Sequence, residues 1–85
     1  MNYPLVTIEV DTVIGEDENL DKRFFEYLEE YSISYKIGED KGSGWPSVEY
    51  TGGPVALSNM LKERFGFSIE DIDELFPDIK KSKNV

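Results

Sequence analysis

Hydrophobic and polar residues alternate along three short segments of the chain, which predicts three strands. Residues 5–13 place Val6, Ile8 and Val10 on one side and polar residues on the other. Successive side chains of a strand point to opposite faces, so each segment is expected to bury one face and leave the other in water. The other two segments with this alternation are residues 33–37 and 45–51.

Apolar residues at helical spacing predict a first helix from Leu20 to Tyr31, between the first two strands. Asn19 is a suitable N-cap, since its side chain can accept a hydrogen bond from a free backbone N–H of the first turn. The expected buried stripe consists of Leu20, Phe24, Tyr27, Leu28 and Tyr31.

Two further helices are expected after the third strand. Pro54 suits the first position of a helix over residues 54–65, because that position needs no backbone N–H, and Gly66 is a suitable left-handed stop. Ser68 and Asp71 have the spacing of a capping box, which predicts a short final helix that ends at Pro77.

The element order is therefore β-α-β-β-α-α, an α+β class. A right-handed crossover through the first helix makes the first two strands parallel, and the glycine-rich loop after residue 38 makes the next two an antiparallel hairpin. We expect a three-stranded mixed sheet with helices on one face. If the third strand inserts beside the first, this is a split βαβ unit, the ferredoxin-like topology lacking its last strand. Residues 1–79 are expected to form a single domain, and residues 80–85 a flexible basic tail.

Charge and composition narrow the functional classes. The 85 residues include 18 acidic and 9 basic ones, a net charge of −9, which disfavours direct binding to nucleic acid or to anionic lipid. The absence of cysteine and histidine removes disulfides, thiolate nucleophiles and the commonest transition-metal ligands. We predict no catalytic residue, no cofactor and no metal. With neither a signal peptide nor a membrane span in the pattern, a cytoplasmic location, bacterial or infected-host, is expected.

Four weaker patterns have simpler structural explanations. Acids at a helix N-terminus are stabilised by the macrodipole without a metal, and Gly52-Gly53-Pro54 reads as a tight turn rather than a phosphate loop. Pairs of carboxylates arise readily in so acidic a chain and do not indicate catalysis. An aromatic platform for nucleic-acid bases would need a basic groove around it. The residues concerned are Glu16, Asp17, Glu18, Asn19 and Asp21 for the metal, Glu9 with Asp11 and Asp71 with Glu74 for catalysis, and Tyr35, Trp45 and Tyr50 for the platform.

The acidic surface of the first 40 residues is the most distinctive feature of the sequence. This segment carries a net charge of −8, and Lys22 has the spacing of helix ion pairs with Glu18 and Glu26. We predict that the acids of the first helix and its flanking loop, together with the sole tryptophan, bind a partner. The predicted partner-binding residues are Glu16, Asp17, Glu18, Glu26, Glu29, Glu30 and Trp45.

In size, acidity and lack of catalytic residues, the chain is similar to the small proteins with which bacteriophages inhibit host defence or nucleic-acid enzymes. This similarity of type assigns no residue. It implies a non-enzymatic protein-binding module, such as an inhibitor, whose partner is a basic, nucleic-acid-binding protein. One alternative is a nucleic-acid mimic that occupies the basic groove of a nuclease or regulator. Another is a ferredoxin-like small-ligand-binding domain that acts as a dimer.

The first strand is expected to lie at an edge of the sheet, where unpaired backbone groups can template another strand. Its apolar face would continue the core across such an interface. We therefore predict a homodimer through Val6, Ile8 and Val10.

Overall fold

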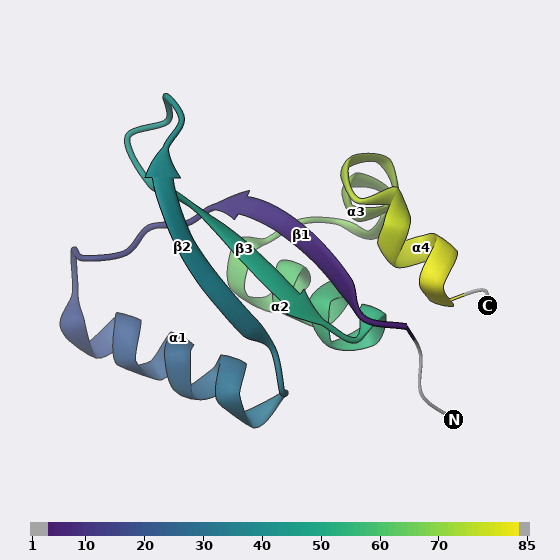
Figure 1. The fold of residues 1–85 in the computed structure, drawn as a ribbon, viewed down its shortest axis with the longest axis horizontal. Helices are drawn as coiled ribbons and strands as arrows, with labels where there is room; N and C mark the ends of the chain where they lie inside the picture. The colour runs from purple at the N-terminus through teal and green to yellow at the C-terminus, as the bar shows by residue number, and fades with distance from the viewer. Residues whose placement is uncertain (1–3, 84–85) are drawn as a thin grey trace.

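The computed structural model describes residues 4–83, which fold in the order β-α-β-β-α-α-α (Figure 1). The α+β class and the order of the first six elements agree with the sequence pattern. The elements are β1 (Val6–Asp11), α1 (Glu18–Glu30), β2 (Ser34–Asp40), β3 (Pro46–Gly52), α2 (Pro54–Phe65), α3 (Ile69–Leu75) and α4 (Pro77–Lys83).

The sheet has the strand order β1-β3-β2, and both of its pairs are antiparallel. The expectation of a mixed sheet was wrong. β1 and β2 do run in the same direction, but β3 lies between them, so no parallel pair forms. The hairpin β2–β3 and the insertion of β3 beside β1 are both present. Tyr50 lies on the central strand, with Ile8 opposite it on β1 and Tyr35 opposite it on β2.

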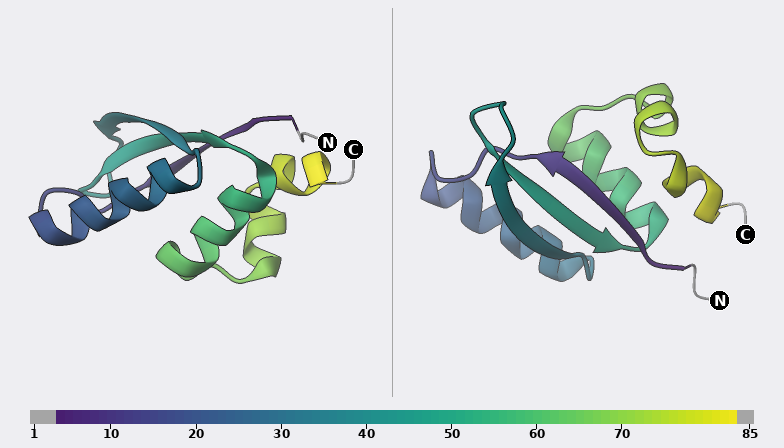
Figure 2. Two further views of the ribbon diagram at one scale, coloured as in Figure 1. Left: turned by 90° about the horizontal axis from the view of Figure 1, so that it is seen from below. Right: turned by 45° about the horizontal axis from the view of Figure 1, so that its top comes forward.

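One face of the sheet is covered by helices and the other is open to water. α1 and α2 lie on the same side of the sheet (Figure 2). Val6, Ile8 and Val10 point to this side and are buried, whereas Thr7 and Glu9 point to the open face and are exposed. The alternation along β1 is therefore as the sequence predicts. The core also contains Leu28, Val48, Tyr50, Leu57, Met60, Leu61, Ile72 and Ile79.

Helix α1 begins earlier than predicted and buries fewer of its apolar side chains. Its N-cap is Asp17, not Asn19, because the Asp17 carboxylate accepts the backbone N–H groups of Asn19 (2.9 Å) and Leu20 (3.3 Å). Leu20 and Tyr31, expected in the buried stripe, are 59% and 50% exposed. These two assignments were wrong: Leu20 lies in the first turn of α1, and Tyr31 is its C-cap rather than a residue of the helix. Tyr27 and Leu28 are its buried residues.

The C-terminal helices follow the local signals closely, with one exception. Gly66 ends α2 in the left-handed conformation (φ 75°), and the Ser68 hydroxyl accepts the Asp71 N–H at 3.2 Å. Pro77 does not simply end a helix, as expected, but opens α4, a position where its missing N–H has no cost. Residues 80–83 belong to this helix, so the expected boundary at residue 79 lies within it, and residues 84 and 85 lie outside the described part.

A chain of hydrogen bonds joins β3 to the end of β1 inside the core. The Thr12 hydroxyl donates to the Val10 carbonyl at 3.0 Å, so the Tyr50 hydroxyl, 2.6 Å from Thr12 Oγ1, must donate to Thr12. Burial raises the pKa of Tyr50 to about 12, so the phenol stays protonated and remains a donor at neutral pH.

We expect Thr12→Val to destabilise the protein by about 1–3 kcal/mol, because it leaves the buried Tyr50 hydroxyl without a partner. Tyr50→Phe should cost only about 1 kcal/mol, since Thr12 keeps its bond to Val10. Urea unfolding of both variants, with Thr12→Ser as the control that retains the hydroxyl, measures the difference. A Tyr50→Phe variant that is less stable than Thr12→Val would contradict this direction of donation.

Candidate functional site

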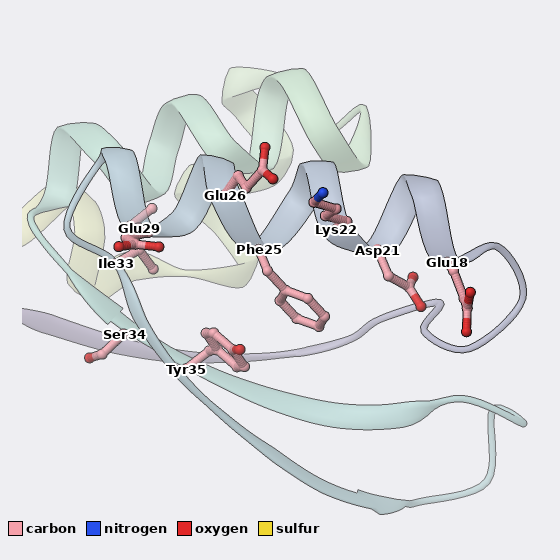
Figure 3. A pocket seen from close by; sticks show the side chains of 9 residues that line it. All are labelled: Glu18, Asp21, Lys22, Phe25, Glu26, Glu29, Ile33, Ser34 and Tyr35. Atoms are coloured by element: carbon pink, nitrogen blue, oxygen red, sulfur yellow. The ribbon is translucent and has the colours of Figure 1, made fainter.

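A groove of about 730 Å³ lies between α1 and β2 (Figure 3). α1 supplies one wall, and the start of β2, with the residue before it, supplies the other. Phe25, Ile33 and Tyr35 give the groove an apolar floor. Acidic side chains of α1 form its rim.

The floor is held by an aromatic contact between the helix and the strand. Phe25 and Tyr35 point toward each other (Figure 3), with their ring centroids 4.9 Å apart and their planes 17° from parallel. The preceding residue, Phe24, turns instead to the core and contacts the Tyr50 ring edge-on at 6.1 Å. Neighbouring residues on a helix point about 100° apart, so this Phe-Phe pair serves the core and the groove at once.

The rim carries four carboxylates and one amino group. Glu18, Asp21, Glu26 and Glu29 all line the groove from α1, with Lys22 among them. The expected ion pairs of Lys22 with Glu18 and Glu26 are absent: within residues 4–83 the ion pairs are Glu9–Lys41 and Asp73–Lys80. The rim therefore keeps its negative charge without compensation from a contacting cation.

Strand β2 is the open edge of the sheet. All seven of its residues are exposed, and in the described part of the chain it pairs with β3 alone. Tyr35 and Ile37 lie opposite the buried Tyr50 and Val48, so they belong to the helix-covered face, yet they are 43% and 48% exposed. The edge of the core is thus left uncovered next to the groove.

The predicted partner-binding acids do not all gather in one place. Glu18, Glu26 and Glu29 line the groove, whereas Glu16 and Glu30 are exposed outside its lining. Asp17 is the N-cap of α1, which gives it a structural role.

The groove also contains residues that were not predicted to bind a partner, although Asp21 and Tyr35 were considered for a metal site and an aromatic platform. These are Phe25, Ile33, Tyr35, Asp21 and Lys22. The one available signal was Phe25 itself, a large apolar side chain outside the expected helix stripe.

Trp45 lies away from the groove, at the end of the β2–β3 loop. Its side chain is half-buried. Its backbone N–H donates to the Ser43 hydroxyl at 3.2 Å, and that hydroxyl donates to the Trp45 backbone carbonyl at 3.2 Å. The loop is ordered by Asp40, whose carboxylate accepts the N–H groups of Gly42 (2.8 Å) and Gly44 (3.1 Å). Trp45 and the acids of α1 are therefore not parts of one continuous site.

The same loop is tied to the open face of the sheet. Lys41 donates to the Glu9 carboxylate at 2.7 Å, which lowers the pKa of Glu9 and raises the pKa of Lys41. Both groups are exposed, so the pair adds little stability. The pair does neutralise an acid on the open face of the sheet, whereas the acids of the groove have no such ion pair with a described residue.

The predicted dimer residues Val6, Ile8 and Val10 are buried in the protein's own core, and α4 packs against β1. The homodimer remains a prediction, and the edge that carries it is partly shielded. Tyr50, one member of the aromatic platform considered above, is fully buried, so the open face does not present these three rings together.

Two other features of the described residues do not provide a ligand site. Among residues 4–83, no group of three acidic side chains is placed to hold a metal ion. A second hollow of about 250 Å³, near Val13, Leu20 and Phe65, is smaller than the usual small-molecule pocket of about 300–1,000 Å³.

Comparison with known proteins finds no matching family model, no matching curated protein and no matching solved structure. None of the helices between residues 4 and 83 has the length and apolar character needed to cross a membrane.

A contact between the partner and the β2–β3 loop, separate from the groove, remains the prediction for Trp45. Trp45→Ala is then expected to weaken partner binding by about tenfold while the fold stays intact, because a tryptophan offers a large contact area. Binding affinity and thermal unfolding, measured together, test this. Trp45→Phe serves as the control that keeps an aromatic ring. Loss of cooperative unfolding in Trp45→Ala would assign the side chain to the core instead.

Proposed function

We propose that this protein is a non-enzymatic binding module that engages a basic protein through the groove between α1 and β2. The observation that carries the proposal is the combination of an apolar floor with four rim carboxylates, which contact no cationic side chain of residues 4–82. Binding sites of proteins combine an apolar centre with a polar rim in this way. An inhibitor of a host defence or nucleic-acid-binding protein, as the phage-type resemblance implies, is the corresponding biological role.

The sign of the charge supports a basic partner. A net charge of −9 steers positively charged surfaces toward the protein and repels nucleic acid. Glu18, Glu26 and Glu29 concentrate this charge at one groove rather than spreading it evenly. The charge thus supplies orientation, and the apolar floor supplies the contact that holds the partner.

The fold supports a more specific structural proposal. A β1-β3-β2 sheet with α1 between β1 and β2 has the connectivity of a split βαβ unit, so a relation to ferredoxin-like domains lacking the last strand is proposed on topology alone. A role as a dimeric ligand sensor would rest on that relation. The groove is better suited to a protein because it is open and bordered by the outer edge of β2, with which no other strand of residues 4–83 pairs.

The experiment that tests the proposed function compares two baits with the same net charge. The triple variant Glu26→Lys, Glu29→Lys and Glu30→Lys should fail to capture the partners that the unaltered chain captures from nuclease-treated cell extract. The control, Glu49→Lys, Glu70→Lys and Glu74→Lys, alters three exposed acids outside the groove and should still capture them. Equal loss in both triple variants would show that only total charge matters.

For a captured partner, we expect the triple variant of α1 to slow association by about tenfold, with a smaller effect on dissociation, because charges at a rim act chiefly on encounter. Raising the salt concentration from about 0.01 M to about 0.15 M shortens the Debye length from about 30 Å to about 8 Å. This change should slow the association of the unaltered chain to a similar extent. Stopped-flow or surface-based kinetics measures both. Salt-independent rates that the triple variant leaves unchanged would refute the electrostatic basis of the proposal.

The nucleic-acid mimic is the narrower form of this proposal. If the groove acids imitate a phosphate backbone, the partner's own DNA or RNA should compete with this protein. A ternary complex of all three would exclude mimicry and leave the binding module standing.

A further inference from the structure

We infer that β2 accepts an extended, basic segment of the partner as a fourth strand of the sheet, with alternate side chains of that segment entering the groove below α1. This inference rests on the proposed function and adds the mode of binding and the chemistry of the ligand. It starts from the backbone of β2 rather than from the charge.

The backbone of β2 is available on one side. In an antiparallel pair every second residue directs its N–H and C=O toward the partner strand, and the residues between direct theirs away. Because β2 pairs only with β3 in the described part of the chain, these outward groups face solvent. The regular part of the pairing extends from Ser34 to Ile37, and a register shift follows before Asp40. An added strand can therefore pair regularly with residues 34–37 of β2.

Helix α1 is positioned over the place that such a strand would take. It projects past β2 on the side away from β3 (Figure 1), and its Phe25 reaches back to stack on Tyr35. A strand added at this edge would continue the pleat, so its alternate side chains would face the same side as Tyr35 and Ile37. They would then cover apolar surface that is now about half exposed.

The groove selects for basic side chains of a particular shape. A lysine or arginine can lay its apolar stem on the Phe25–Tyr35 pair while its charged end reaches Glu26 or Asp21 on the rim. Arginine adds the favourable stacking of its guanidinium on an aromatic face. The expected ligand is thus a strand with arginine or lysine at every second position.

A second copy of this chain is a poor occupant of the same edge. Two β2 strands paired through residues 34–37 would bring the acidic rims of two α1 helices together on one face of the joined sheet. Like charges that are brought close together repel each other. Charge complementarity therefore favours a basic strand over self-pairing.

The test uses a blocked octapeptide of alternating arginine and threonine and the isotope-labelled full chain at low salt. Binding should slow hydrogen exchange at alternate backbone amides between residues 34 and 37 and should shift the signals of Phe25 and Tyr35. The acidic counterpart, with glutamate in place of arginine, should not bind. No change at the β2 amides with the arginine peptide would overturn the inference.

Two N-methylated versions of the peptide distinguish strand addition from simple charge attraction. One carries N-methyl groups on the threonine amides and the other on the arginine amides, and only one of these sets can face β2. One version should lose about tenfold or more in affinity, and the other should keep most of it. Equal binding of both would overturn strand addition while leaving the proposed function intact, because the salt and charge-reversal experiments decide that separately.

Protein variants give an independent check. Ile37→Lys places a positive charge at the exposed edge and should weaken peptide binding by about tenfold. Val55→Lys adds the same charge at a residue of α2 that is 49% exposed, against 48% for Ile37. This variant should change the affinity for the peptide by no more than about twofold. Equal effects would overturn the assignment to β2. Slowed exchange at the β2 amides on concentrating the protein alone, with dimer in sedimentation, would identify a second copy as the occupant and would also overturn it.

Discussion

The width of the sheet is the constraint on which the rest of this structure depends. Each strand of a sheet takes up about 4.8 Å, so three strands are only about 14 Å wide, whereas two helices packed side by side are about 20 Å wide. α2 packs against β3 and is supported by α3 and α4. α1 must then extend past the sheet, because residues 4–83 supply no fourth strand to receive it (Figure 1). The half-exposed rings of Phe25 and Tyr35 and the groove between them follow from this mismatch.

Much of the fold could be predicted because its signals are local. Alternation identified the buried face of β1, and Gly66 and Ser68 marked helix ends through backbone conformation and capping. The errors arose where a local signal allowed two outcomes. Asp17 and Asn19 are both good caps, and a proline such as Pro77 can follow one helix or open the next. A further error, the mixed sheet, came from treating parallel direction as parallel pairing.

The candidate site was harder to predict because it depends on which surfaces the tertiary structure leaves uncovered. Composition indicated the acidic character of α1, and Glu18, Glu26 and Glu29 do line the groove. Nothing local distinguishes Tyr35 in an edge strand from the same residue in a covered one, since its exposure depends on how far α1 is displaced. The ion pairs expected for Lys22 had suitable spacing, but exposed pairs gain too little free energy for spacing alone to enforce them.

The register shift between Ile37 and Asp40 has a consequence for solubility. A long, flat, apolar edge can grow into fibrils, because each added chain offers a new edge to the next. Here the straight part of the edge is interrupted after a few residues, at a point where Gly38 lies so close to the Ser47 carbonyl that a Cβ would be 2.9 Å from it. The irregularity therefore limits growth of the sheet to a short segment. An open edge can persist in this way without making the chain a seed for aggregation.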